Sequence, residues 1–309
     1  MTVALVTGSH GFVGTHLRKE LAGRGWTVVG LGRSVRRAGD AEQYVRADLT
    51  SQDEVVTALE SVRPDVVFHL AATPGARASG EVTSVVAATY ALCSALVTTG
   101  QRPRVVLAGS SAQYGALRRD ENPVTEDSRF QPVGAYGLAK AAAEHTARAF
   151  AAGGTFEVVP VRAFNHVGPG EPPTTVASAL ARRVADVLAG HADTVTVADL
   201  AAVRDFTDVR DIARGYADLA ERAVPGRPYN LCSGRATTVA DVLDGLLAAA
   251  GLDRSVVRPL PAAPLASGTI SYQVGCPRRT RDEIGWETTR ELADSLRGLL
   301  EEVQRDSGR

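Results

Sequence analysis

The first 160 residues alternate short apolar runs rich in Val and Leu with longer amphipathic segments. Continuous apolar runs are typical of strands buried on both faces of a parallel sheet, whereas strands with one wet face alternate apolar and polar residues. Repeated strand–helix units of this kind predict an α/β fold with a doubly wound parallel sheet. We expect strands at residues 2–7, 27–31, 65–70, 104–108 and 157–161, and helices at 12–24, 52–62, 83–99 and 135–152.

After Arg162 the pattern changes. The stretch at 168–173 (GPGEPP) disfavours regular structure and predicts a loop that leaves the sheet. The remainder mixes expected helices with short expected strands, which indicates a smaller interleaved C-terminal lobe that binds the substrate. We expect helices at 175–188, 209–223, 239–250 and 290–303, and strands at 194–197 and 228–231. The predicted domains are residues 1–165 plus about 206–232 for the sheet, and about 166–205 plus 233–309 for the lobe.

Composition narrows the class of protein. With 34 basic and 35 acidic side chains the formal charge is −1, so no broad electrostatic attraction to nucleic acid or an anionic membrane is expected. The apolar runs look shorter than a bilayer span, and the first strand begins at residue 2, where a signal peptide would lie. Cys93, Cys232 and Cys276 lack metal-site spacing, so we expect reduced thiols and no metal. These features favour a cytoplasmic protein.

A glycine-rich turn follows the first expected strand. Residues 7–14 read TGSHGFVG and open the first expected helix. Glycines at this spacing let the backbone turn tightly and approach a pyrophosphate, whose charge the helix N-terminus stabilises. The position of this motif predicts a Rossmann-type dinucleotide site. The expected cofactor-binding residues are Gly8, His10, Gly11, Phe12, Val13 and Gly14.

The end of the second strand indicates which nicotinamide cofactor binds. An NAD site usually carries an acidic residue there, but this chain reads LGRSVRR at 31–37 and has no carboxylate before Asp40. Guanidinium groups suit a 2′-phosphate, so Arg33, Ser34 and Arg36 favour NADPH. An arginine-rich surface loop is the alternative. Further expected contacts are Asp48 and Leu49 with the adenine, and Leu70, Ala71 and Ala72 with the pyrophosphate.

Tyr136 and Lys140 stand four residues apart, on one face of an expected helix. A phenol with a pKa of about 10 is a poor acid–base catalyst at neutral pH unless a nearby cation lowers that pKa, and Lys140 would supply the cation. Both side chains are also expected to contact the cofactor. A catalytic hydroxyl is expected just after the strand at 104–108. Ser111 is the preferred residue and Ser110 is the alternative, because the loop length there can differ by one residue.

These motifs resemble the extended short-chain dehydrogenase/reductases over nearly the whole chain. The segments most similar to the branch of GDP-mannose 4,6-dehydratases and GDP-4-keto-6-deoxymannose reductases are 110–115 (SSAQYG), 162–170 (RAFNHVGPG), 203–211 (VRDFTDVRD) and 229–234 (YNLCSG). The resemblance implies a nucleotide-sugar substrate and a homodimer. It also implies that Asn165 and Arg204 anchor the nucleotide diphosphate, and that Ser110, Ser111 and Gln113 line the sugar.

The loop at 109–115 distinguishes the activities in this family. The resembling dehydratases carry an acidic residue just after the catalytic hydroxyl, and the epimerase-reductases that make GDP-fucose carry a cysteine nearby, but this chain has Ala112 and Gln113. The prediction is therefore an NADPH-dependent 4-ketoreductase of a GDP- or dTDP-linked 4-keto-6-deoxyhexose. A nucleotide-sugar 4-epimerase, a 4,6-dehydratase and a non-catalytic NADP-binding protein remain as alternatives.

Overall fold

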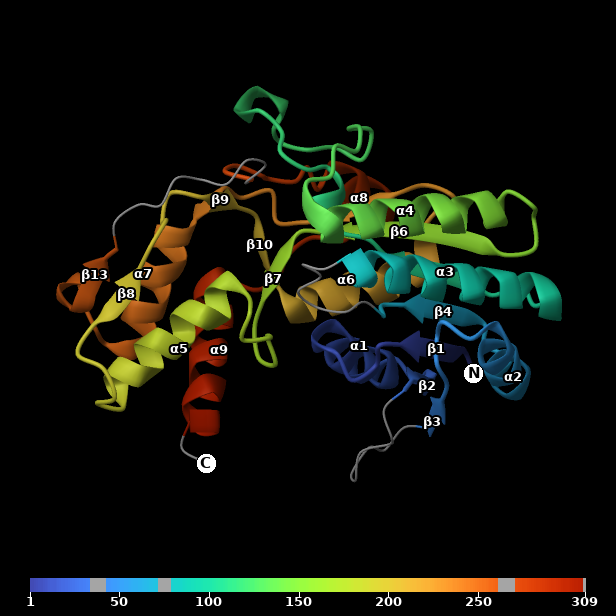
Figure 1. The fold of residues 1–309 in the computed structure, drawn as a ribbon, viewed down its shortest axis with the longest axis horizontal. Coiled ribbons are helices and arrows are strands. Elements are labelled where there is room, and N and C mark those ends of the chain that lie inside the picture. The colour runs from blue at the N-terminus through green and yellow to red at the C-terminus, as the bar shows by residue number, and fades with distance from the viewer. Residues whose placement is uncertain (34–42, 72–78, 261–269, 308–309) are drawn as a thin grey trace.

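The computed structural model describes residues 1–33, 43–71, 79–260 and 270–307. Its centre is a sheet of seven strands, all parallel, in the order β11-β6-β5-β4-β1-β2-β3 (Figure 1). The chain runs outward from β1 to β3 and then returns to β4 beside β1, which makes a doubly wound sheet with a switch point between β1 and β4. The strands are β1 Val3–Thr7, β2 Thr27–Gly32, β3 Gln43–Arg46, β4 Val66–His69, β5 Arg104–Ala108, β6 Glu157–Ala163 and β11 Tyr229–Leu231.

Helices cover both faces of this sheet. Alternate residues of β1 point to opposite faces, so Ala4 and Val6 enter one core cluster and Leu5 enters the other. On the first face the packed helices are α1 (Phe12–Gly23), α6 (Val209–Arg222) and α8 (Arg278–Ile284). On the second face they are α2 (Gln52–Val62), α3 (Ser79–Thr99) and α4 (Gly134–Ala151). The predicted fold class is therefore confirmed.

A smaller lobe with its own core lies beside the sheet (Figure 1). Its helices are α5 (Val176–Leu188), α7 (Val239–Ala250) and α9 (Leu292–Ser307), which contact one another. Three two-stranded sheets accompany them: β7 (Asn165–Val167) with β10 (Phe206–Asp208), β9 (Val203–Arg204) with β12 (Thr237–Thr238), and β8 (Val195–Val197) with β13 (Val257–Pro259).

The two cores do not divide where the sequence pattern placed the boundary. Ile284 and Trp286 lie in the range assigned to the lobe, yet both pack in the core of the sheet against α6. The Trp286 indole nitrogen donates to the Asp211 carbonyl at 3.0 Å, which satisfies its only polar group in a fully buried position. The chain therefore returns to the sheet layer once more before it enters α9.

Side-chain caps explain where four of the helices begin. A Ser, Thr or Asp oxygen accepts a first-turn backbone amide in each case, which satisfies a donor that has no partner within the helix. The capping residues are Ser51 for α2, Thr175 for α5, Asp208 for α6 and Thr238 for α7. Short 3₁₀ helices lie at η1 Ser111–Gln113, η2 Arg119–Glu121 and η3 Arg254–Val256.

One helix of the described residues is longer and more apolar than expected. Val82–Thr99 of α3 has a mean hydropathy of 1.6 and could span a membrane by length and composition, so the expectation that every apolar run is too short is wrong here. Part of this segment is buried, and α3 packs against α2 and α4 over the sheet. A helix that covers a parallel sheet meets the same compositional test, so this is weak evidence for a membrane span.

Candidate active site

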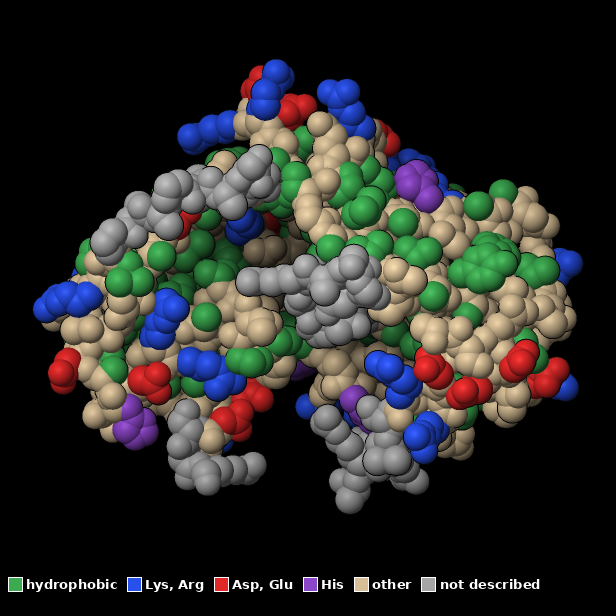
Figure 2. Space-filling model, viewed as in Figure 1, with side chains coloured by type: hydrophobic (Ala, Val, Ile, Leu, Met, Phe, Trp, Pro, Cys, Tyr) green, Lys and Arg blue, Asp and Glu red, His purple; other side chains and the backbone are tan. Residues whose placement is uncertain are grey.

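The fold brings the predicted site residues to one edge of the sheet. Each group follows the carboxyl end of a strand: the glycine turn after β1, Arg33 after β2, Asp48 after β3, Leu70 after β4 and Ser110 after β5. Doubly wound sheets bind their ligands at this edge, next to the switch point. In the view of Figure 2 the surface is hollowed between the sheet and the smaller lobe.

The glycine turn has the geometry of an anion cradle. Gly8 has φ +68°, and a Cβ there would lie 3.1 Å from backbone atoms of Ala71. A Cβ on Gly14 would lie 2.3 Å from the Gly8 carbonyl oxygen, so only glycine lets α1 start this close to the turn. Unlike α2, α5, α6 and α7, α1 receives no side-chain cap at its N-cap residue, Gly11. Its first-turn amides therefore suit a bound pyrophosphate.

A buried histidine that the sequence analysis missed supports this cradle. His69, at the end of β4, lies 3.0 Å through Nδ1 from the Thr7 hydroxyl, and Thr7 in turn accepts the Ala71 amide at 3.1 Å. Its Nε2 lies 3.2 Å from the Thr89 hydroxyl. Burial, with a smaller effect of the Lys140 charge, lowers the pKa of His69 to about 3, so the ring is neutral. This chain of bonds fixes the β4 end beside the glycine turn.

Three side chains of the motif pack against neighbouring residues of the protein. His10 stacks on Tyr44 with ring centroids 4.8 Å apart, and Phe12 stacks on His166 at 5.5 Å. Val13 packs against the core of the sheet. These three residues can therefore contribute to a pyrophosphate site mainly through their backbone amides.

Arg33 and Asp48 lie near each other at the ends of β2 and β3. Hydrogen bonds from Thr50 and, more weakly, the charge of Arg33 lower the pKa of Asp48. Arg33 is exposed, while Leu49 and Leu70 are partly buried. Ser34, Arg36 and Ala72, which were also expected to contact the cofactor, lie outside the described residues.

Tyr136 and Lys140 occupy the first two turns of α4. Burial raises the pKa of Tyr136, and a hydrogen bond with the Ser110 hydroxyl partly offsets this rise. Lys140 is 4% exposed, and its ammonium donates to the Ala108 carbonyl at 2.7 Å. Burial lowers the pKa of Lys140 to about 8. The expectation that Lys140 lowers the pKa of Tyr136 is therefore not what the structure shows: burial is the larger effect on the phenol.

The structure separates the two candidate serines and revises the assignment of Gln113. Ser110 is the N-cap of η1 and lowers the pKa of Tyr136, whereas Ser111 is 4% exposed and its carbonyl accepts the Gln273 amide at 3.0 Å. Gln113 is fully buried, and its amide bonds the Ser110 backbone and Glu144. Gln113 therefore does not line the sugar, because both ends of its amide are occupied inside the protein.

Asn165 and Arg204 lie on the short strands that lead into the lobe. Asn165 begins β7, opposite Phe206 of β10, and its side chain is partly buried. The Arg204 guanidinium donates to the carbonyls of Val203, at 2.9 Å, and Ile270. Burial lowers the pKa of Arg204. Backbone carbonyls thus orient a partly desolvated guanidinium, and no carboxylate among the described residues forms an ion pair with it.

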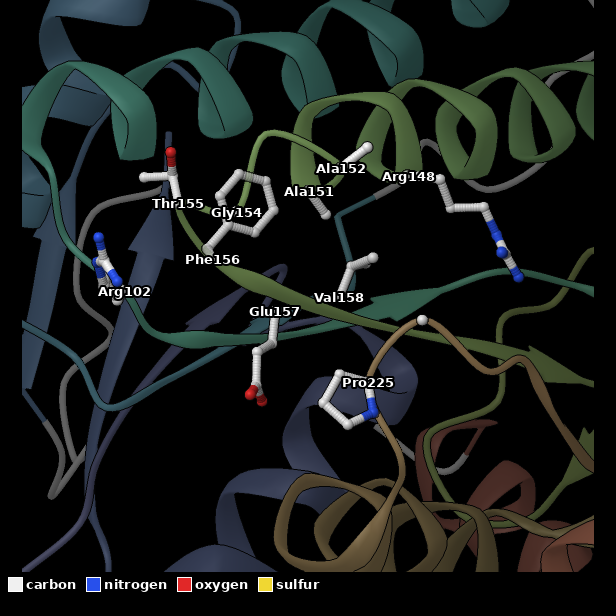
Figure 3. A pocket seen from close by; sticks show the side chains of 11 residues that line it. Arg102, Arg148, Ala151, Ala152, Gly154, Thr155, Phe156, Glu157, Val158 and Pro225 are labelled. Atoms are coloured by element: carbon white, nitrogen blue, oxygen red, sulfur yellow. The ribbon is translucent and has the colours of Figure 1, made fainter.

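A cavity of about 530 Å³ lies at the opposite edge of the sheet, where β5 and β6 begin (Figure 3). Arg102 and Arg148 stand on its two sides, and Phe156 and Pro225 lie between them. The glycine turn and Ser110 instead follow the carboxyl ends of their strands, so this cavity is separate from the candidate site. Across the described ranges, no group of three His, Cys, Asp or Glu side chains is arranged to hold a metal ion.

Comparison with known proteins finds relatives along nearly the whole chain. The model of the NAD dependent epimerase/dehydratase family matches residues 4–232. GDP-6-deoxy-D-mannose reductase of Pseudomonas aeruginosa is 28% identical over 303 residues, covering 96% of this chain and 95% of that protein. A structure of RMD from Pseudomonas aeruginosa complexed with NADPH has a TM-score of 0.86 at 26% identity, over 99% of this chain and 98% of that one. UDP-glucose 4-epimerase of Thermus thermophilus, complexed with NAD, has a TM-score of 0.85 at 26% identity, over 98% and 99% of the two chains.

Proposed function

The chain belongs to the NAD dependent epimerase/dehydratase family, and within it we propose an NADPH-dependent 4-ketoreductase of a nucleotide-linked 4-keto-6-deoxyhexose. The product is a nucleotide-activated 6-deoxysugar. The similarity to GDP-6-deoxy-D-mannose reductase supports this proposal and favours GDP as the carrier. A dTDP-linked substrate would use the same chemistry at C4.

The proposed cofactor site fits NADPH. The uncapped N-terminus of α1 and the turn at Gly8 supply amide donors for the pyrophosphate. Arg33 is exposed beside Asp48, where a guanidinium can pair with a 2′-phosphate. When bound, the cofactor supplies the hydride that reduces the C4 ketone.

The proposed proton donor is Tyr136. Reduction needs the protonated phenol, and burial, which raises the pKa of Tyr136, keeps it protonated at neutral pH. We assign the hydroxyl that holds the C4 oxygen to Ser110, because it is hydrogen-bonded to the same phenol. Lys140, with a pKa of about 8, is mostly charged at pH 7, and its proposed role is to hold the ribose of the nicotinamide.

The loop after β5 is the observation that favours reduction over dehydration. A 4,6-dehydratase needs a base to remove the C5 proton, and residues 109–115 contain no carboxylate. Ala112 cannot ionise, and Gln113 is buried with its amide engaged. Hydride delivery with proton transfer from Tyr136 requires no such base.

We further propose how the substrate and a second subunit bind. Asn165 and Arg204 anchor the diphosphate from the lobe side; the carbonyl-held guanidinium of Arg204 supports this role, because a preoriented guanidinium binds phosphate bidentately. A homodimer through α3 and α4 is supported by apolar side chains exposed on these helices: Tyr90 and Val97 on α3 and Leu138 on α4.

A 4-epimerase is the second candidate, favoured by the similarity to UDP-glucose 4-epimerase. An epimerase first oxidises the C4 alcohol, so it needs the phenolate of Tyr136 as a base. The raised pKa of Tyr136 opposes that step. Arg33 also stands where an NAD site usually carries an acidic residue.

The test is NADPH oxidation, followed by absorbance, with GDP- and dTDP-linked 4-keto-6-deoxyhexoses generated by their dehydratases. We expect rapid oxidation with one of them, and a loss of about 100- to 10,000-fold in turnover in Tyr136→Phe with cofactor affinity retained. If both ketosugars leave NADPH unchanged while UDP-glucose is epimerised, the reductase proposal is wrong.

A further inference from the structure

Gln113 is a polar side chain buried at the centre of the candidate site. It ends η1, directly after β5, and is fully inaccessible to solvent. Its Oε1 accepts the Ser110 backbone amide at 2.7 Å, and its Nε2 donates to a Glu144 carboxylate oxygen at 2.8 Å. Both ends of the amide are therefore used, one by each neighbour.

Glu144 sets the direction of this amide. Two turns after Tyr136 on α4, it accepts Arg162 through both oxygens, at 2.7 and 3.0 Å, and Arg148 at 3.1 Å. Burial alone would raise the pKa of Glu144, but the bonds and charge of Arg162 bring it below its usual value. An ionised carboxylate only accepts hydrogen bonds, so Gln113 must present its NH₂ to Glu144 and its carbonyl oxygen to Ser110.

Close backbone packing holds η1 against these partners. A Cβ on Gly109 would lie 2.3 Å from the side-chain oxygen of Gln113, and a Cβ on Gly137, the residue after Tyr136, would lie 2.4 Å from the Ala112 carbonyl. The Ser110 hydroxyl also accepts the Ala112 amide at 3.2 Å. With one lone pair used by Ala112, the hydroxyl of Ser110 has its proton free for Tyr136.

From this geometry we propose that Gln113 is a positioning residue for the ketone reduction. It connects the Glu144–Arg162 pair to the Ser110 backbone and thereby aims the Ser110 hydroxyl at the Tyr136 phenol. The expected change in kcat rests on the proposed function, whereas the expected change in the pKa of Tyr136 does not. A glutamate at position 113 could not replace it, because a second buried carboxylate would face Glu144.

The kinetic test is a double-mutant cycle between Gln113→Met and Ser110→Ala. Methionine keeps the volume of the side chain and removes both hydrogen bonds. We expect Gln113→Met to lower kcat by about 10- to 100-fold with little change in KM, since a small misplacement of a catalytic group costs this much. In the Ser110→Ala background the same change should have no further effect. Equal losses in both backgrounds would overturn the proposal.

Gln273→Met is the matched control. Gln273 is also a buried glutamine that contacts the loop after β5, but it donates to the Ser111 and Gly115 carbonyls, and no hydrogen bond joins it to Ser110. We expect its kcat to stay within about threefold of the wild type, as for a change that spares the reacting groups. An equal loss of kcat in Gln273→Met and Gln113→Met would refute a specific role for Gln113.

A second readout needs no substrate. The pKa of Tyr136 is followed by NMR of the full chain labelled with ¹³Cζ-tyrosine, and Tyr136→Phe assigns its signal. Gln113→Met and Ser110→Ala should each raise this pKa, because the bond that lowers it is lost, and Gln273→Met should not. An unchanged pKa in Gln113→Met refutes the proposal. A raised pKa in a protein that reduces no ketosugar upholds the positioning of Ser110 by Gln113, whereas the proposed function and the kinetic consequence fail.

Discussion

Replacing Lys140 by methionine is expected to stabilise the fold at pH 7 while removing most of the proposed activity. Burial lowers the pKa of this lysine from 10.5 to about 8, so a charged Lys140 opposes folding. At about 1.4 kcal/mol per pH unit, the difference corresponds to a cost of roughly 3 kcal/mol at pH 7. The variant also loses the hydrogen bond to the Ala108 carbonyl, which destabilises it by about 1 kcal/mol. The free energy of unfolding of Lys140→Met should therefore exceed that of the wild type by about 2 kcal/mol.

The gain should depend on pH. Between pH 8 and 10.5 folded Lys140 is neutral and unfolded Lys140 still binds a proton, so the wild type becomes more stable relative to the variant as pH rises. At pH 9.5 the cost of burying the charged lysine has fallen to about 1 kcal/mol, which the hydrogen bond to Ala108 offsets. Lys140→Met and the wild type should then have nearly the same free energy of unfolding. Urea unfolding at pH 7 and 9.5 measures both values, with Lys19→Met, which changes an exposed lysine, as the control. An equal effect of Lys140→Met at the two pH values would refute the reasoning.

Three further changes test other parts of the structure. Arg33→Ala should raise the KM for NADPH by about tenfold or more and leave the KM for NADH nearly unchanged, because a charge-assisted bond to the 2′-phosphate is lost. Arg102→Ala, at the opposite edge of the sheet, is the control. Equal effects of Arg33→Ala on the two KM values would refute the assignment of NADPH. Leu246→Ala, fully buried in the lobe core, should lower the free energy of unfolding by about 2–5 kcal/mol in urea titrations. Burial raises the pKa of Glu171 to about 7, so Glu171→Gln should stabilise the protein more at pH 8, where the buried carboxylate is charged, than at pH 5. A gain for Glu171→Gln that is no larger at pH 8 would contradict this burial effect.

The sequence by itself determined the elements that depend on local pattern. The expected strand at 104–108 and the helices at 52–62 and 239–250 have the observed bounds, because apolar periodicity and turn residues act over a few positions. The glycine turn at Gly8 and the pairing of Tyr136 with Lys140 on one helix were also predictable, since each lies within a single short segment. Less regular elements were missed: α8 has only seven residues, and β9 and β12 have two each.

Only the tertiary structure decided which distant residues meet. His69 joins Thr7 across 62 positions of sequence, and no local pattern marks a histidine at a strand end as buried and neutral. The sequence predicts Gln113 as a substrate contact, but in the fold its amide is bonded to Glu144, 31 residues away. The same packing buries Lys140 and half-buries Tyr136, and this desolvation shifts the pKa values of both. Desolvation and hydrogen-bond partners depend on what surrounds a side chain in space, which the spacing of residues along the chain does not specify.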